Sequence, residues 1–515
     1  MLLFMFVCCL CFICLDILSK IFGDRSLVPS DVLAGLLLLS HKTRREKEKE
    51  KESGRDSLGV AGRTVFDRMG VSLVQVEVEN DEGNSCLEIV SESERIRLDW
   101  ANTKHYYKYA AAAYGYMWWM MQSPLTHCCQ LSYYIHCCGC RQSDEFFVEG
   151  DGMFKPNLAA IKAMLHVSEE DILMFDNRNM IEEVPFLLVA DKKTKSLVIS
   201  IRGTLSLHDM LTDLRGDPGQ ICDLNPEWTA HLGMVNCAKY VLSRLHGQVT
   251  EREKSLGGSG AVEPVSRPNL SSSLESEEYN DYQLVVTGHS LGAGTAAILA
   301  FLLREKYPAR QVHCYAYSPP GGLLSQAAAR ESEKFTVSVL VGDDVIPRLS
   351  LRNIGTLSSD IKRSITSCSL PKYQIFGESL SPLSDVILHT TNCSGYGCLA
   401  CLFSRPRSRL SAELDRLYPS GPVSSGDGVA TSSQPADHPA SQLISVPPMF
   451  LPGRVLHLEP SGEGDKEQFR VTERRKEDFD EILVSPRMLS DHMPNHLDRV
   501  FKCCPNTLNI IPVLV

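Results

Sequence analysis

The stretch that decides the fold is LVVTGHSLGAGTAA, residues 284–297. It begins with apolar, β-branched residues typical of a buried strand, and the small residues after Gly292 are typical of a helix. The Gly-x-Ser-x-Gly pattern between them is that of a nucleophile elbow, a sharp strand-to-helix turn. Gly288 and Gly292 leave room where a Cβ would clash, so Ser290 is predicted to present its hydroxyl at the carboxyl end of the strand. A chance Gly/Ser turn is the alternative, but the flanking strand and helix favour the elbow.

Strand-like and helical patterns alternate on both sides of the elbow. Strands are predicted at residues 186–190, 196–201, 313–317 and 335–341, and helices at 102–121, 230–245 and 485–501. This alternation predicts an α/β fold with a mostly parallel sheet flanked by helices. Because loops at the carboxyl ends of parallel strands lie together, the residues that follow each strand are the candidates for a site.

A nucleophilic serine needs a base that is itself oriented by a carboxylate. In α/β-hydrolases the three follow the chain order Ser, Asp or Glu, then His. Asp343 and Asp344 come directly after the strand predicted at 335–341, where the acid should lie. We favour Asp344, with an ordinary helix-capping or loop aspartate as the alternative.

Six histidines after the elbow are candidates for the base: His313, His389, His438, His457, His492 and His496. The first precedes the acid, the next two fall in an irregular segment, and the last two lie in the predicted terminal helix. His457 ends a short strand that follows the irregular segment. The pattern therefore favours His457 as the base.

The oxyanion of an acyl-transfer intermediate needs two hydrogen-bond donors near the nucleophile. The N–H of Leu291 lies at the start of the elbow helix, where the helix dipole favours negative charge. Arg202-Gly203-Thr204 ends the strand predicted at 196–201, as the loop with the second donor should. Gly203 allows a close backbone approach, and Thr204 offers an N–H and a hydroxyl. An ordinary strand-to-loop turn is the alternative.

Charge and cysteine usage exclude some classes of protein. The 515 residues carry a formal net charge of −11, which argues against a general nucleic-acid binder. The 19 cysteines are odd in number and gather in clusters at residues 8–14, 128–140, 393–401 and 503–504, unlike a secreted disulfide framework. Adjacent cysteines near apolar runs fit S-acylation of a membrane-associated cytosolic protein. A zinc site at Cys137-Cys138-x-Cys140 lacks a matching second ligand pair.

Two segments bear on membrane contact. Residues 2–15 are apolar or cysteine, too short a run for a complete span of about 20 residues. They also lack the charged start and cleavage site of a secretory signal, so they suggest the end of a membrane segment or a monotopic anchor. The aromatic-rich stretch 102–121 is most simply core, but its adjacent Trp118 and Trp119 could enter a membrane interface.

The Arg-Gly-Thr strand end followed by a Gly-His-Ser-Leu-Gly elbow resembles the class 3 lipase family of α/β-hydrolases. Further segments narrow the resemblance to the sn-1-specific diacylglycerol lipases: AAAAYG (110–115), RGTLSLHDMLTDL (202–214), GHSLGAGTAAIL (288–299), YSPPGGL (317–323), DVIPR (344–348) and PGRVLH (452–457). The tail SPRMLSDHMP (485–494) resembles the beta form in particular.

This resemblance implies hydrolysis of the sn-1 ester of diacylglycerol to a 2-acylglycerol, such as the endocannabinoid 2-arachidonoylglycerol, and a free fatty acid. Ser290, Asp344 and His457 match the family's nucleophile, acid and base positions. The family implies a membrane-associated enzyme with a cytosolic catalytic domain, at the plasma membrane, that acts on lipid in the bilayer and not on nucleic acid. It is associated with calcium, although no acidic cluster identifies a site and the chemistry requires no cofactor. The alternatives are a less selective triacylglycerol lipase or phospholipase, and a catalytically inactive membrane scaffold.

The expected domain organisation follows from the resemblance and from composition. The relatives carry a four-helix transmembrane region, of which residues 1–26 resemble at most the end of one helix, as in a truncated or alternative transcript. We expect a residual membrane segment at 1–26, a helix and charged linker at 27–100, the lipase catalytic domain at 101–350 with an exposed insertion at 247–280, a partly disordered regulatory insertion at 351–446, and the remainder of the catalytic domain, with the catalytic histidine, at 447–515. The charged run at 42–55 is a solvated linker or a contact for anionic lipid headgroups.

Overall fold

The computed structural model describes residues 28–60, 73–79, 85–122, 147–149, 151, 155–179, 182–203, 218–247, 270–376, 407–418, 448–460 and 469–503. The chain divides into two units. Unit 1 comprises residues 1–70, 351–447 and 481–488, and unit 2 comprises residues 71–350, 448–480 and 489–515. The elbow lies in unit 2.

Within the described residues, unit 2 contains a nine-stranded sheet in the order β13-β12-β11-β10-β9-β6-β5-β4-β3. The strands are β3 (Phe147–Glu149), β4 (Ile172–Asp176), β5 (Phe186–Asp191), β6 (Ser196–Ile201), β9 (Gln283–His289), β10 (Val312–Tyr317), β11 (Thr336–Val341), β12 (Arg454–Pro460) and β13 (Phe469–Arg474). The five strands from β6 to β12 in this order are parallel, and the pairs β5–β6 and β12–β13 are antiparallel. The predicted mostly parallel sheet is confirmed.

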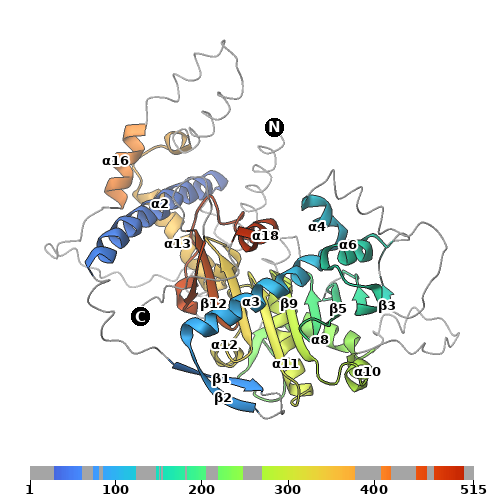
Figure 1. Ribbon diagram of the computed structural model, residues 1–515. Helices are drawn as coiled ribbons and strands as arrows, with labels where there is room; N and C mark the ends of the chain where they lie inside the picture. Colours follow the sequence, from blue (N-terminus) through green and yellow to red (C-terminus); the bar gives the residue numbers. More distant parts are fainter. Residues whose placement is uncertain are drawn as a thin grey trace. The chain divides into compact units, whose positions relative to one another are not determined.

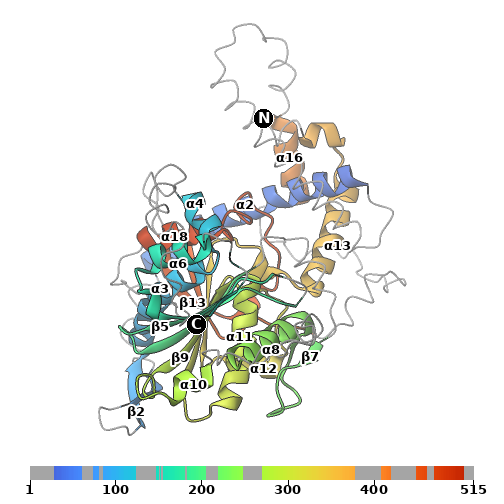
Figure 2. The same cartoon turned by 90° about the vertical axis from the view of Figure 1, so that its right-hand side faces the viewer.

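Helices cover both faces of this sheet (Figure 2). One face carries α3 (Glu92–Ala112), α4 (Gly115–Gln122), α6 (Pro156–Leu165) and α18 (Pro494–Cys503), and the other carries α8 (Leu232–Leu245), α11 (Leu291–Lys306) and α12 (Gln326–Ser332). Every residue of β5, β6 and β11 is buried. Burial on both faces explains why apolar residues occupy both of the alternating sets of positions in these strands.

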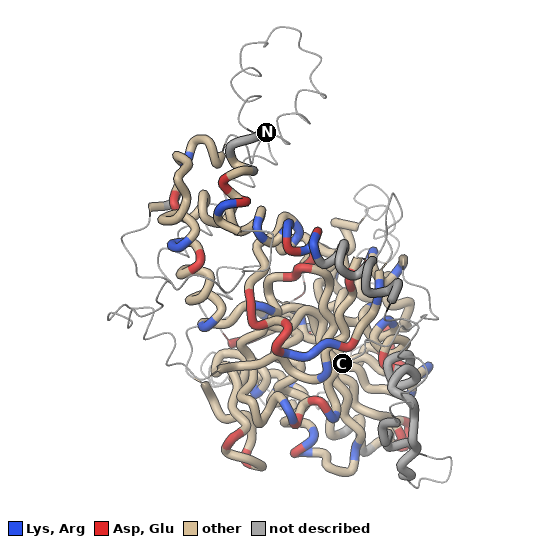
Figure 3. Tube along the Cα trace, turned by 90° about the vertical axis from the view of Figure 1, so that its left-hand side faces the viewer, with Lys and Arg blue, Asp and Glu red and all other residues tan. Residues whose placement is uncertain are grey.

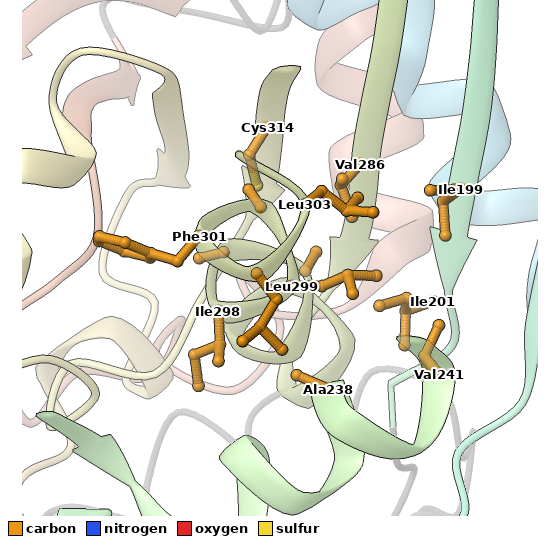
Figure 4. Packing of buried hydrophobic residues seen from close by; sticks show 14 of the residues in the cluster. Ile199, Ile201, Ala238, Val241, Val286, Ile298, Leu299, Phe301, Leu303 and Cys314 are labelled. Carbon is orange, nitrogen blue, oxygen red and sulfur yellow. The ribbon is translucent and has the colours of Figure 1, made fainter. Parts of the chain in front are cut away.

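The larger hydrophobic core lies between the sheet and α8 with α11. Ile199 and Ile201 of β6 face Val241 of α8, while Val286 of β9 and Leu303 of α11 fill the same layer (Figure 4). All five side chains are fully buried, with exposed fractions of 0%. The strand and helix that flank the elbow are therefore held by continuous packing, which fixes the turn between them.

The predicted aromatic helix at 102–121 is two helices, because the chain breaks at Gly115, whose φ is +65°. The first helix, α3, runs across one face of the sheet (Figure 1), and its Tyr106 ring stacks on Tyr315 of β10 with centroids 4.9 Å apart. Trp118 is buried, as expected of a core residue. Met117, however, is 51% exposed on α4.

In unit 1 the structure differs from the predicted linker and irregular segment. Helix α2 (Pro29–Val60) continues through the charged run, α13 (Leu351–Ser367) and α16 (Arg407–Leu417) lie in the expected insertion, and the helices pack through small apolar clusters. Basic and acidic residues are interspersed along the described part of α2 (Figure 3). Ion pairs one turn apart, such as Arg44 with Glu48 at 3.0 Å, support the charged part of this helix.

Two other expectations meet the structure only in part. The predicted exposed insertion at 247–280 ends in a helix, α10 (Leu270–Glu275), with Leu270 and Leu274 in the core. Between α2 and α3, the described residues form the hairpin β1 (Leu73–Glu79) and β2 (Ser85–Ser91). Residues 1–26 and the cysteines at 128–140 and 393–401 lie outside the described residues. No helix among those described is long and apolar enough to cross a membrane.

Candidate active site

The elbow has the predicted strand–turn–helix geometry. Strand β9 ends at His289, α11 begins at Leu291, and Ser290 between them has φ +59° and ψ −127°. Such a backbone is unfavourable for a residue with a side chain, and it persists only where the surroundings hold it. Here the Ser290 N–H donates to the Tyr317 carbonyl at 2.9 Å. A Cβ on Gly292 would lie 2.3 Å from the Ile201 carbonyl oxygen, so the crossing of helix and β6 requires glycine.

Ser290, His492 and Asp344 form one hydrogen-bonded chain. His492 Nε2 lies 3.0 Å from Ser290 Oγ, and His492 Nδ1 lies 3.1 Å from both carboxylate oxygens of Asp344. The side chains are nearly enclosed, with Ser290 2%, Asp344 3% and His492 9% exposed. Because a carboxylate accepts only, Nδ1 carries the proton, and Nε2 is left as the acceptor for the Ser290 hydroxyl. This is the geometry of an activated serine.

The acid and base loops are tied to each other and to the fold. The Asp344 carboxylate also accepts the Ile346 N–H at 3.0 Å, which fixes its rotation. The carboxylate of Asp491, the residue before the base, accepts the Asp343 N–H at 2.9 Å. The turn that carries His492 is therefore fastened to the loop that carries Asp344.

The prediction that His457 is the base is wrong. His457 lies within β12, and its Nε2 is 2.8 Å from the Gly342 carbonyl while its Nδ1 is 3.2 Å from the Glu459 carboxylate. Both ring nitrogens thus face acceptors other than Ser290. Contact with His457 and with Arg474 lowers the pKa of Glu459 to about 2 despite partial burial, which raises it. His457 fastens strand β12 to the end of β11.

The base was missed because the terminal helix was predicted to begin at Ser485. It begins at Pro494, and His492 lies in the turn before it. Proline is favoured at the first position of a helix and disfavoured in its interior. Pro494 was therefore the signal that places His492 in a loop, where a base can approach the carboxyl ends of the strands.

The candidate oxyanion donors are described in part. Leu291 is the first residue of α11, and its N–H lies at the helix N-terminus beside Ser290. A Cβ on Gly203 would lie 3.3 Å from the Ser290 Cβ and 2.3 Å from the His289 carbonyl oxygen. The loop after β6 therefore runs alongside the nucleophile, as expected. Thr204 itself lies outside the described residues.

The described residues hold no group of three or more His, Cys, Asp or Glu side chains placed to bind a metal ion. The Ser290–His492–Asp344 chain is the arrangement in which a serine supplies the nucleophile and an imidazole supplies the base.

Residues 198–354, which include the elbow, Asp344 and the end of β6, match the family model described as Lipase (class 3). This part of the chain is similar to class 3 lipases. The chain is 32% identical to mouse diacylglycerol lipase-beta over 505 aligned residues. The aligned region covers 94% of this chain and 65% of that protein. It is 29% identical to human diacylglycerol lipase-alpha over 501 aligned residues, and this aligned region covers 92% of this chain and 41% of that protein.

The lipase resemblance predicted from the sequence motifs, including its beta-like character, is confirmed by these matches. The chain spans less than two thirds of the length of either relative. Among solved structures, the mono- and diacylglycerol lipase from Aspergillus oryzae is 21% identical, with a TM-score of 0.32 over 48% of this chain and 72% of that one. A likeness at that level adds nothing to the family match.

Proposed function

We propose that this chain is a serine lipase that hydrolyses the sn-1 ester of diacylglycerol, releasing a 2-acylglycerol and a fatty acid. The observation that carries the chemistry is the hydrogen-bonded chain from Ser290 through His492 to Asp344. The substrate class is supported by the similarity to mouse diacylglycerol lipase-beta.

In the proposed first half-reaction, His492 Nε2 takes the Ser290 hydroxyl proton as Oγ attacks the ester carbonyl. The N–H groups of Leu291 and Thr204 stabilise the oxyanion, and Asp344 stabilises the imidazolium. Collapse breaks the bond to the glycerol oxygen, which takes the proton from His492. In the second half, His492 removes a proton from water, hydroxide adds to the acyl-enzyme, and Ser290 leaves with that proton as the fatty acid is released.

Diacylglycerol labelled in the sn-1 acyl chain tests both the chemistry and the position of attack. The wild-type chain is expected to release labelled fatty acid and to react with a fluorophosphonate probe, whereas Ser290→Ala does neither. Equal labelling of both proteins by the probe would refute the assignment of Ser290. Faster turnover of triacylglycerol or phospholipid would favour the less selective lipase, and no ester turnover by the wild type would favour the inactive scaffold.

We further propose that the reaction needs no metal ion, because the three side chains supply nucleophile, base and acid. Chelation with EDTA is expected to leave turnover of a soluble short-chain ester unchanged. A loss that added calcium restores would show instead that the calcium association of the family extends to this chain.

We propose that the catalytic unit works at a membrane surface, on the cytosolic side of the plasma membrane. Helix α4 begins directly after Tyr114, which contacts the elbow residue His289 at 2.8 Å. On this helix Met117 is 51% exposed, Met121 is 58% exposed and Tyr116 is 37% exposed. Exposed apolar residues on a short helix beside a lipid-hydrolysing site can enter the bilayer interface.

The double substitution of Met117 and Met121 with lysine is expected to weaken sedimentation with neutral phosphatidylcholine vesicles and to lower turnover of vesicle-borne diacylglycerol about tenfold, since burying a methionine contributes roughly 1.5–3 kcal/mol. Turnover of a soluble ester should not change. Leu224→Lys is the matched control. Leu224 is 60% exposed, and the adjacent Asp223 N–H bonds Glu305 near the end of α11, about 20 Å along the helix from Ser290. Equal loss in the control would refute the role of α4.

A further inference from the structure

A second buried series of hydrogen bonds joins Tyr114, His289 and the backbone of His492. Tyr114 Oη lies 2.8 Å from His289 Nδ1, and His289 Nε2 lies 2.9 Å from the backbone carbonyl oxygen of His492. Because a carbonyl only accepts, Nε2 must carry the hydrogen, which leaves Nδ1 to accept from the Tyr114 hydroxyl. The direction of both hydrogen bonds is therefore fixed by the partners.

The Tyr114 hydroxyl also contacts the oxyanion loop, which is the loop that follows β6 and contains Gly203. A Cβ on Gly203 would lie 2.6 Å from the Tyr114 hydroxyl oxygen, so the hydroxyl lies directly against the backbone of Gly203. A Cβ on Gly203 would also lie 3.3 Å from the Ser290 Cβ, so the end of β6 passes close to the nucleophile. Tyr114 and His289 thus connect three separate parts of the sequence: the loop after β6, the elbow strand, and the turn that carries the base.

Burial keeps both members of this chain neutral. Desolvation, together with the nearby His492 ring, holds the pKa of His289 well below its usual range, and burial raises the pKa of Tyr114. The His289 and His492 rings lie 4.8 Å apart. A neutral His289 leaves His492 free to become the cation during proton transfer, because a second positive charge at that distance would oppose it.

We propose that Tyr114 and His289 are positioning residues that hold the backbone of His492 and the oxyanion loop at Gly203 in register with Ser290. This inference rests on the proposed function. The Tyr114–His289 chain contacts the base through its backbone, so it sets where the imidazole stands without taking part in proton transfer. Displacement of a reacting group by about 1 Å can lower a rate about a hundredfold.

Substitutions at His289 can separate the two hydrogen bonds. In His289→Gln the side-chain NH₂ reaches the position of Nε2 and can still donate to the His492 carbonyl. In His289→Asn the side-chain oxygen reaches the position of Nδ1 and can accept from Tyr114, but the link to His492 is lost. We expect kcat for a soluble ester to fall at least about tenfold more in His289→Asn than in His289→Gln, with KM unchanged within about twofold.

Tyr114→Phe removes one oxygen atom and with it the hydrogen bond to His289 and the contact with the Gly203 backbone. We expect kcat to fall about tenfold with KM unchanged, in the full-length chain. Tyr106→Phe is the matched control, because the Tyr106 hydroxyl is also buried and bonds Ser196 Oγ at 2.8 Å at the opposite end of β6. It is expected to retain the wild-type kcat within about twofold while losing similar stability.

A wild-type kcat in Tyr114→Phe would overturn the inference. So would equal losses of kcat in the two His289 variants, if those losses follow the decrease in melting temperature. Failure of all three variants to fold, under conditions where Tyr106→Phe folds, would also overturn it. Fluorophosphonate labelling separates this failure from failure of the proposed function. If the probe does not label the wild type at Ser290, the proposed function fails, whereas unchanged labelling rates in folded variants refute only the Tyr114–His289 role.

Discussion

His492→Ala is expected to lower kcat for diacylglycerol by about 10⁴-fold or more, as removal of the base does in other serine hydrolases. His492 Nε2 lies within 3.0 Å of Ser290 Oγ, and its partner Asp344 fixes the proton on the far nitrogen. Without the imidazole, the Ser290 hydroxyl must lose its proton to water at its own high pKa. Initial rates on purified protein, with a parallel fluorophosphonate labelling rate, measure the effect.

His457→Ala is the control that decides between the two histidines. His457 is buried and bonds the Gly342 carbonyl, so its loss is expected to lower the melting temperature but to leave kcat within about tenfold of wild type. Measuring both variants at a temperature where both are folded separates the two effects. The reverse result, an active His492→Ala and an inactive His457→Ala, would overturn the catalytic chain seen in the structure.

The nucleophile and the acid could be predicted because their signals are local. Ser290 sits in a five-residue pattern between a recognisable strand and helix, and Asp344 follows a recognisable strand. The base has no such pattern, because the contact with Ser290 spans 202 residues and depends on how the last helix docks. The sequence pattern favours a strand-end histidine over a histidine in a predicted helix, and it places the start of that helix at Ser485, nine residues before Pro494.

The features that sequence reasoning missed are those set by tertiary contact. The charged part of α2 reads as a linker by composition, yet helical ion pairs such as Arg44–Glu48 support it. His289 reads as a variable position within the elbow pattern, and its bonds to Tyr114 and His492 join residues far apart in the chain. Hydrophobic periodicity reports which face of an element is buried, and it carries no information about which polar groups meet across the core.

Asp344→Asn is expected to lower kcat by about 10⁴-fold although the side chain keeps its size. The backbone N–H of Ile346 donates to Asp344 Oδ1 at 3.0 Å, so the amide oxygen of the variant will occupy that position. The NH₂ group then takes the place of Oδ2, 3.1 Å from His492 Nδ1, and a hydrogen bond there requires Nδ1 to accept. That forces the imidazole proton onto Nε2, where it faces Ser290 Oγ and blocks removal of the hydroxyl proton.

Asp343→Asn is the matched control, because Asp343 joins the same loop through its backbone N–H, which donates to Asp491 and survives the substitution. It is expected to lose far less activity than Asp344→Asn at the same pH. Fluorophosphonate labelling rates of both variants give the comparison, since the probe also requires an activated Ser290. Similar rates for the two variants would mean that the carboxylate of Asp344 only fills space, and that the tautomer of His492 is set by something other than its contact with Asp344.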